Sequence, residues 1–343
     1  MRGAANAVRR LSTAKRVPGV VFDIDGVLLR GKIPVPGAGA VLCHLRENGI
    51  PFVLLTNGGG VSEAEKAAVV TKRLECSFDL RAEEIVQVHT PLQAFAEHHR
   101  GQRVLVLGKR YPKLKAVMEG YGFGAEGGEV LTADVFHAQH PSLYRDMEPE
   151  MEEPGLDERP IRGVFALTDP IAWGRELQIA CDVLRSNGTI GDMVDSQIVP
   201  FYNCCSDFEY QSDFHLPRFG AGAFTFALRA LYKELTGRHL REVQLGKPHE
   251  VSFDWAEHVL RDQAHELHGK EVDVGPVFMV GDNPLTDILG ASMRGSNWVP
   301  VLTRSGMFTG PDDAGKAAGA KHIIDSVKAL PELIRAESSE GSV

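Results

Sequence analysis

The 343-residue sequence has no long hydrophobic run and no surplus of basic residues. No stretch approaches the roughly 18 consecutive apolar residues that a membrane-spanning helix needs, so we expect no membrane span. The 37 Lys and Arg residues are outnumbered by 46 Asp and Glu residues, and the formal net charge is -9. Because phosphate backbones recruit clusters of Lys and Arg, this balance argues against nucleic acid as a partner.

Cysteine is sparse and histidine is scattered. The cysteines are odd in number and show no CxxC spacing, so the sequence predicts neither a disulfide framework nor a zinc site. They are Cys43, Cys76, Cys181, Cys204 and Cys205. The histidines show no ligand-like grouping, and we expect surface or helix positions for them. Those considered are His44, His89, His98, His99, His249 and His258.

The start of the chain lacks acidic side chains. Val8 and Leu11 lie one helical turn apart within it, and the basic residues are Arg2, Arg9, Arg10, Lys15 and Arg16. A basic, acid-free and amphipathic start is typical of a mitochondrial transit peptide. Residues 1–17 are therefore predicted to be a targeting segment, and the protein is predicted to be mitochondrial, in the matrix. A disordered basic tail is the alternative.

Short β-type runs alternate with helical patterns along the rest of the chain. This order predicts an α/β fold in which a mostly parallel, Rossmann-like doubly wound sheet is covered by helices on both faces. The predicted strands are 20–24, 52–56, 104–108, 277–281, 298–302 and 322–325.

Two polar regions interrupt this pattern. Residues 145–160 are acidic and contain prolines, so they are predicted to form a solvated loop. Residues 336–343 cannot bury enough apolar area to offset the entropy of ordering, so they are predicted to be a disordered tail.

Four sets of polar side chains each lie at the carboxyl end of a predicted strand. In open α/β sheets, ligands bind at the carboxyl ends of the strands. A lone buried Asp is more often a satisfied structural group, but an ordered set of acids, a hydroxyl and a lysine is far more specific. In chain order the set is Asp23 and Asp25, Thr56 and Asn57, Lys247, and Asp282 and Asp287.

These residues resemble the four motifs of the haloacid dehalogenase superfamily: a DxD strand end, a Thr or Ser strand end, a Lys, and a GDxxxxD-type acidic loop. The segments "DIDGVLL", "LLTNGG" and "GKP" look like the class IIA subclass, which includes p-nitrophenyl phosphatases and NagD-like enzymes. The segments "LPRFGAGAFTFALRALYKELTGR", "LGKPHE" and "GDNPLTDILGA" are similar to the mitochondrial cat eye syndrome critical region protein family. The resemblance covers residues 18–334.

The resemblance implies an α/β cap of the second type (C2) between the second and third motifs. The spacing agrees, because Thr56 follows Asp23 by 33 residues whereas Lys247 follows Thr56 by 191. A short hairpin at 28–37 is expected in the first gap. The expected domains are core segments at 18–90 and 225–335 and a cap at 91–224 that contains the acidic loop 145–160.

The resemblance implies a Mg²⁺-dependent phosphatase that hydrolyses a small phosphorylated metabolite through an aspartyl-phosphate. Asp23 would attack phosphorus, and Asp25 would protonate the leaving alcohol and later deprotonate the hydrolytic water. Haloacid dehalogenases of this superfamily lack an acid at the second position, so Asp25 argues for phosphoryl transfer. A phosphotransferase or phosphomutase would use the same core chemistry.

A divalent metal is expected because the carboxylate nucleophile and the phosphate are both anions. Hard oxygen ligands suit Mg²⁺. The ligands implied by the resemblance are Asp23, the backbone carbonyl of Asp25, Asp282 and Asp287. Lys247 would neutralise charge at the reacting centre, and the phosphoryl oxygens would bind at Thr56, Asn57, Gly58 and Lys247.

A second class of function stays open. A mitochondrial scaffold or assembly subunit could keep the fold and act by binding a protein partner. The insertion at 145–160 motivates this alternative. So does "YNCCSDFEY" (202–210), which stands where relatives carry an Asn-Pro-Asp type of substrate loop. Because related caps often mediate dimerisation, a homodimer through the cap is also expected.

Overall fold

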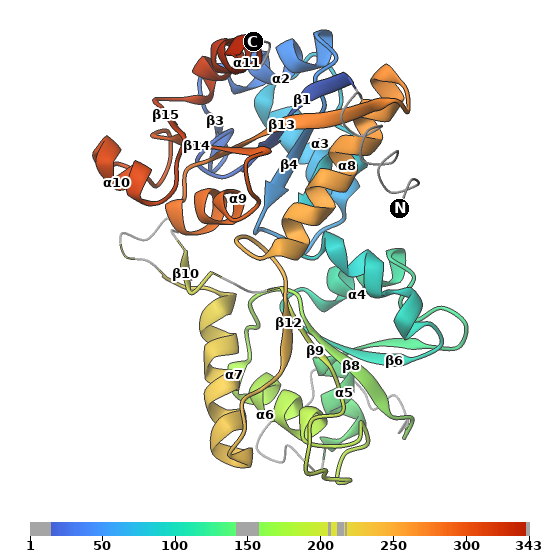
Figure 1. Ribbon diagram of the computed structural model, residues 1–343. Helices are drawn as coiled ribbons and strands as arrows, with labels where there is room; N and C mark the ends of the chain where they lie inside the picture. The colour runs from blue at the N-terminus through green and yellow to red at the C-terminus, as the bar shows by residue number, and fades with distance from the viewer. Residues whose placement is uncertain (1–14, 142–157, 205–206, 211–215, 217, 341–343) are drawn as a thin grey trace, which may run out of the picture. The chain divides into compact units, whose positions relative to one another are not determined.

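A computed structural model describes residues 15–141, 158–204, 207–210, 216 and 218–340. By its internal contacts the chain divides into two compact units. The first unit comprises Met1–Thr56, Glu63–Val86 and Lys247–Val343, and the second comprises Asn57–Ser62 and Gln87–Gly246. Each unit has its own sheet (Figure 1).

The first unit is built on a six-stranded sheet. Its strands are β1 (Lys15–Phe22), β4 (Phe52–Thr56), β5 (Ile85–Gln87), β13 (Val272–Gly281), β14 (Trp298–Thr303) and β15 (His322–Ile324). They lie in the order β15-β14-β13-β1-β4-β5. The pairings from β15 across to β4 are parallel. The non-sequential order of a doubly wound α/β sheet is therefore confirmed.

Successive side chains of β1 point alternately into two apolar clusters, one on each face of the sheet. Val20 and Phe22 are fully buried in one apolar cluster, which also holds residues of α2 (Ala38–Glu47), α3 (Glu63–Leu74) and α11 (Leu330–Glu340). Val21 lies in a second cluster with residues of α8 (Glu250–His268). Since successive strand residues point to opposite faces, helices cover both sides of this sheet. The remaining helices of this unit are α9 (Leu289–Ser292) and α10 (Asp312–Ala317).

The ends of the first unit differ in part from the predictions. Residues 1–14 of the predicted targeting segment lie outside the described residues, and Lys15–Val17 begin β1. The expected hairpin at 28–37 is confirmed by the antiparallel pair β2 (Leu29–Arg30) and β3 (Ile33–Pro34). The predicted disorder from 336 onward is wrong for residues 336–340, which continue α11. Glu337 accepts hydrogen bonds from Lys321 and His322 there.

The second unit carries a five-stranded sheet in which all neighbouring strands are parallel. The strand order is β12-β9-β8-β6-β7. These strands are β6 (Arg103–Leu107), β7 (Glu129–Thr132), β8 (Ile161–Ala166), β9 (Phe201–Asn203) and β12 (Glu242–Gln244). The helices are α4 (Tyr111–Gly120), α5 (Ala133–Gln139), α6 (Trp173–Leu184) and α7 (Ala221–Thr236). A small antiparallel pair, β10 (Glu209–Tyr210) and β11 (Arg218–Phe219), completes the unit.

The second unit extends past the expected end of the cap. The boundary predicted at 224/225 falls inside α7, whereas the contact-based boundary falls at Gly246/Lys247. The reason is physical, since α7 packs with α6 and β12 pairs with β9, both within the second unit. Most of the predicted acidic loop, residues 145–157, lies outside the described residues.

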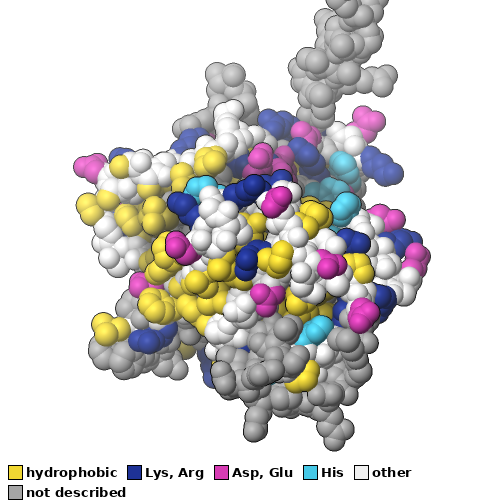
Figure 2. Space-filling view, turned by 90° about the horizontal axis from the view of Figure 1, so that it is seen from below, with side chains coloured by type: hydrophobic (Ala, Val, Ile, Leu, Met, Phe, Trp, Pro, Cys, Tyr) yellow, Lys and Arg dark blue, Asp and Glu magenta, His cyan; other side chains and the backbone are white. Residues whose placement is uncertain are grey.

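The described surface carries both apolar and charged groups. In the second unit, Phe226, Leu231 and Leu235 of α7 are exposed, and Phe226 meets Phe208 edge to face. Figure 2 shows one face of the molecule, on which apolar side chains lie among Lys, Arg, Asp and Glu. In the part of the chain that the structure describes, no helix combines the length and apolar character needed to cross a bilayer.

Candidate active site

The carboxyl edge of the first sheet gathers most of the predicted site residues. Asp23 follows β1, and its amide donates to Val280 of β13 at 2.9 Å. Asp282 directly follows β13, and Thr56 ends β4 on the other side of β1. Because these strands run parallel, their carboxyl ends meet at one edge. Asp23, Thr56 and Asp282 are all buried there.

Lys247 connects the acids of this edge. Its Nζ lies 2.5 Å from Asp23 Oδ1 and 2.7 Å from Asp287 Oδ1. It also donates to the carbonyl of Leu55 at 2.9 Å, one residue before Thr56. The lysine therefore contacts two of the acids and the end of β4.

Three buried carboxylates converge at one point. Asp23, Asp282 and Asp287 each offer an oxygen, and these atoms all lie within 4.8 Å of one another. Carboxylate oxygens are the donors that hard divalent cations prefer. One Lys247 ammonium against three carboxylates leaves an excess negative charge, which is costly in a buried site. The donor set and its charge therefore fit a divalent metal ion.

The pKa values of the acids reflect this crowding. Burial raises the pKa of Asp282 to about 6, and the nearby Asp287 acts in the same direction. Burial also raises the pKa of Asp23 well above its usual value, although Lys247 opposes the shift, and the adjacent acids Asp287 and Asp282 act in the same direction as burial. Burial by itself would lower the pKa of Lys247, but Asp23 and Asp287 raise it, so the lysine is held as a cation. A bound cation would favour the ionised acids.

A close turn shapes the site around Asp282. Its Oδ2 accepts from the amide of Met307 at 2.6 Å. Gly26 has a φ of +96°, and a Cβ there would overlap the Asp282 carboxylate. Glycine is therefore required at position 26 for both its backbone conformation and its small volume.

Asp25 stands apart from this cluster. Its side chain is exposed, two residues after buried Asp23, and its backbone forms an isolated bridge with Leu29. Asp23 and Asp25 therefore lie in different environments.

Asn57 and Gly58 belong to the second unit by their contacts, although they follow Thr56 directly. Both residues line a cavity of about 270 Å³ whose lining residues all come from that unit. Asn57 Nδ2 donates to Asp207 Oδ1 at 3.2 Å. Asp207 lies in the 202–210 segment, so the predicted phosphate-binding segment contacts the segment that departs from the pattern of the relatives.

The comparisons agree with this geometry. The "Haloacid dehalogenase-like hydrolase" family model matches residues 20–124, and a second HAD-hydrolase-like model matches residues 244–330. The mitochondrial hydrolase YKR070W of Saccharomyces cerevisiae is 34% identical over 358 residues, which cover 94% of this chain and 97% of the yeast protein. The chain belongs to the haloacid dehalogenase-like hydrolases. It is thus an enzyme of the hydrolase type.

Further relatives agree with this assignment. A cardiolipin synthase (CMP-forming)/mitochondrial hydrolase fusion protein of Schizosaccharomyces pombe is 35% identical over 324 residues, covering 92% of this chain. The match spans only 53% of that fusion protein. Among solved structures, the p-nitrophenyl phosphatase of Archaeoglobus fulgidus is 17% identical, with a TM-score of 0.62 over 93% of this chain and 99% of that chain. This likeness establishes a shared fold.

Sequence reasoning missed three charged residues that line the cavity of the hydrolase's second unit. Lys109 follows β6, Asp169 follows β8 and Asp207 follows β9. Burial raises the pKa of Asp169, although Lys109 opposes the shift. The rule that ligands bind at the carboxyl ends of parallel strands, applied to a second sheet, could have found them. The signal was present in "VLGK" and "ALTD".

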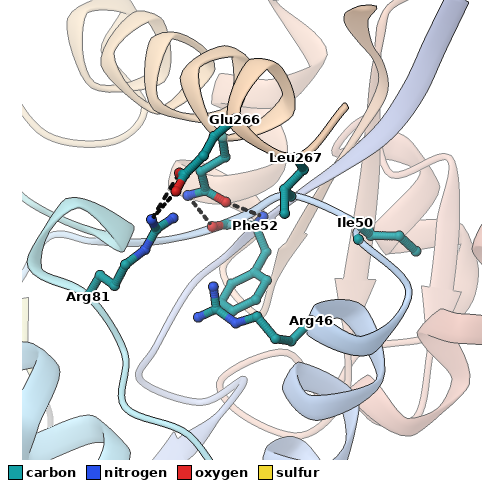
Figure 3. Close-up of a pocket in the computed structure, with 8 residues that line it drawn as sticks. Arg46, Ile50, Phe52, Arg81, Glu266 and Leu267 are labelled. Atoms are coloured by element: carbon teal, nitrogen blue, oxygen red, sulfur yellow. Dashed lines mark hydrogen bonds and ion pairs between the residues drawn. The ribbon is translucent and has the colours of Figure 1, made fainter. Parts of the chain in front are cut away.

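Another cavity of the hydrolase, of about 150 Å³, lies in the first unit beside Phe52, the first residue of β4 (Figure 3). It is thus at the strand end opposite Thr56. Arg81 donates to Glu266 at 2.9 Å, and Gln263 bonds to both backbone polar groups of Phe52. Arg46 forms a bidentate pair with buried Glu84. Since both arginines already have carboxylate partners, this cluster stabilises the core.

The expectation that the histidines occupy surface or helix positions is wrong for His89, which is buried in a turn. His99 is also buried, but it ends the 3-10 helix Glu97–His99, as expected. His99 bonds to Gln102 and to Tyr202, each at 3.0 Å. Hydrogen bonding to neutral partners compensates this burial, and such partners cannot be read from single-sequence spacing.

Proposed function

We propose that this hydrolase is a Mg²⁺-dependent phosphatase that acts on a small phosphomonoester through an aspartyl-phosphate on Asp23. The carrying observation is the set of three buried carboxylates, Asp23, Asp282 and Asp287, around Lys247. A nucleophile of this kind needs charge compensation before it can approach a phosphate. Bound Mg²⁺ would supply that compensation and polarise the phosphoryl group.

The roles of the chain's own residues follow. Asp23 would attack phosphorus, while Lys247 holds Asp23 in position and offsets charge. Asp25, with its exposed carboxyl, would donate a proton to the leaving alcohol and later accept one from water. Thr56, Asn57, Gly58 and Lys247 would bind the phosphoryl oxygens. The proposed metal ligands are Asp23, the backbone carbonyl of Asp25, Asp282 and Asp287.

We further propose that the second-unit cavity, which Asn57 and Gly58 line, takes a small, hydroxyl-bearing group. The second-unit cavity, about 270 Å³, lies below the roughly 300–1,000 Å³ of pockets for drug-sized ligands. Its described lining combines an ammonium donor on Lys109 with acceptors on Asp169 and Asp207, and contains no aromatic ring. Hydroxyl groups both donate and accept, so they match a mixed lining. A nucleobase would favour an aromatic platform.

Phosphate release with Mg²⁺ tests the enzyme proposal. Wild type and Asp23→Asn are compared on p-nitrophenyl phosphate, glycerol phosphate, sugar phosphates and nucleoside monophosphates. We expect metal-dependent release by wild type, a loss of at least about a thousandfold in the variant, and a preference for polyol phosphates. Equal phosphate release by wild type and Asp23→Asn on every ester would refute the proposed phosphatase activity. A preference for nucleotides would refute only the proposal of a hydroxyl-bearing substrate.

The alternative of a non-catalytic scaffold has less support. The chain belongs to a hydrolase family, and the acids and lysine that the chemistry needs are all present. A homodimer through the second unit and a mitochondrial protein partner stay predictions. Exposed Phe226, Leu231 and Leu235 on α7 would favour such an interface. Sedimentation of wild type and Phe226→Ser would test for the dimer.

We propose a mitochondrial location, in the matrix. Support comes from the basic, acid-free start of the sequence and from two yeast relatives that are named mitochondrial hydrolases. Fractionation with protease protection of mitoplasts is the test. Digestion of the protein in intact mitochondria would contradict the matrix assignment.

A further inference from the structure

The segment that carries Asn57 and Gly58 is bonded to one short stretch of the second unit. Gly60 N donates to His89 Nε2 at 3.0 Å. The side chain of Gln87 donates to Val61 O at 2.8 Å, and Val88 N approaches Gly58 O at 3.4 Å. Three successive residues, 87–89, therefore hold the segment that follows Thr56.

The bond to Gly60 fixes the protonation of His89. A backbone N–H can only donate, so Nε2 of His89 must be the unprotonated acceptor. In the neutral ring the proton is then on Nδ1, which lies 2.7 Å from Tyr121 Oη. Nδ1–H donates to the tyrosine oxygen. The geometry thus selects one tautomer of a histidine that has no exposed surface.

Packing leaves this arrangement little freedom. A Cβ added to Gly59 would lie 2.7 Å from His89 Cδ2, so the backbone of the segment rests directly against the imidazole ring. The ring of Tyr121 also packs against the imidazole of His89, and the centroids of these two rings lie 5.9 Å apart. A shift of the ring would therefore be passed to the backbone at Gly59 and Gly60.

We propose that His89, as the Nδ1–H tautomer, is a positioning residue for the phosphate-binding segment 57–60. The inference rests on the proposed function, because that function gives Asn57 and Gly58 their role. His89 acts by fixing the amide of Gly60 and thereby the path of the backbone between Thr56 and Gly60. A backbone amide contributes to phosphate binding only when its N–H is already aimed at the anion.

Two substitutions separate this role from simple core filling. In His89→Gln the side-chain oxygen can reach the Nε2 position and accept from Gly60, whereas in His89→Asn the amide reaches only the Nδ1 position. Both variants remove the ring, so both lose similar packing. Tyr121→Phe is the mild third variant, which removes the acceptor for Nδ1–H and leaves the ring in place.

The probe is inorganic phosphate with Mg²⁺, and its dissociation constant is measured for each protein. We expect His89→Gln to bind within about twofold of wild type and His89→Asn to bind about tenfold more weakly, which corresponds to one hydrogen bond. Imidazole ¹⁵N spectra of wild type should contain one neutral ring with protonated Nδ1 that is missing in both variants. Thermal unfolding checks that the two variants are equally folded.

Equal phosphate affinities in His89→Gln and His89→Asn would overturn the inference, as would an Nε2–H tautomer in wild type. If His89→Asn does not fold, Tyr121→Phe is the deciding variant. Loss of the Nδ1–H signal together with weaker phosphate binding would support the positioning role of His89. Unchanged phosphate binding in Tyr121→Phe would overturn it. Turnover of p-nitrophenyl phosphate by wild type is measured separately. Absence of turnover would contradict the proposed phosphatase activity. The tautomer of His89 and the phosphate dissociation constants of the variants would still test the positioning role of His89.

Discussion

Lys247 Nζ lies 2.5 Å from Asp23 Oδ1, although 224 residues separate the two in the sequence. Both side chains are buried. The same ammonium lies 2.7 Å from Asp287. One cation thus contacts two of the three clustered acids.

Lys247→Met should destabilise the protein. The substitution leaves Asp23 and Asp287 buried without their cation, and breaking a buried pair in this way costs roughly 3–5 kcal/mol. Denaturant unfolding measures the loss. The double variant Lys247→Met/Asp287→Asn removes one of the stranded charges and should recover part of it. Equal stability of wild type and the single variant would contradict the argument.

Asp25→Ala should separate the two half-reactions. Attack by Asp23 on an ester with a good leaving group needs no proton donor, so a phosphoenzyme should still form slowly from p-nitrophenyl phosphate. Turnover should fall about 10²–10⁴-fold because water is no longer activated. Rapid-quench phosphoenzyme trapping beside steady-state turnover is the measurement. Equal losses in the rate of phosphoenzyme formation on activated and unactivated esters would remove the general-acid role from Asp25, and an unchanged rate of phosphoenzyme hydrolysis would remove its general-base role.

Mg²⁺ should raise the thermal midpoint of wild type, and chelation should reverse the rise. A ligand that binds only the folded state stabilises it by about 2.7 kcal/mol at a hundredfold excess over its dissociation constant. Asp282→Asn should reduce the response because it removes one of three clustered carboxylates. Asp312→Asn, an exposed acid in α10, is the control. The same Mg²⁺ response in wild type and Asp282→Asn would argue against the cluster as the metal site.

Gly26→Ala should lower both stability and metal affinity. Its φ of +96° is unfavourable for alanine, at a cost of about 1–3 kcal/mol. The added methyl group would also overlap the Asp282 carboxylate. Gly31→Ala is a matched control, because φ is +61° there but a Cβ meets nothing within 4 Å. Calorimetric titration with Mg²⁺ should show weakened binding only at position 26.

His99 should make stability depend on pH. Burial lowers the pKa of His99 from its unfolded value of 6.5. As pH falls below 6.5 the unfolded chain takes up a proton that folded His99 does not, so stability decreases with falling pH, by at most about 1.4 kcal/mol per pH unit. Unfolding midpoints at pH 5.5 and 7.5 measure this slope. His99→Phe should flatten the slope.

The sequence was sufficient to predict five of the six strands of the first sheet and its acidic edge, but it missed β5 (Ile85–Gln87). Apolar runs that end in Asp23, Thr56 and Asp282 mark both the strands and the residues that meet where they end. Lys247 could be placed at the same edge from the sequence, but its contacts with Asp23 and Asp287 could not, because these partners are remote in sequence. The extension of the second unit to Gly246 was missed, since it depends on the pairing of β12 with β9. Burial of His89 was missed for the same reason, since Gly60 and Tyr121 are distant partners.

The assignment of residues 57–62 to the second unit has a practical meaning for engineering. The chain passes from one unit to the other after Thr56, before Glu63, after Val86 and after Gly246. Deleting residues 87–246 and joining the ends would therefore remove the partners of Gly58, Gly60 and Val61. A minimal version of this hydrolase cannot be made by one internal excision, because six residues of the remaining part would lose the surface against which they fold.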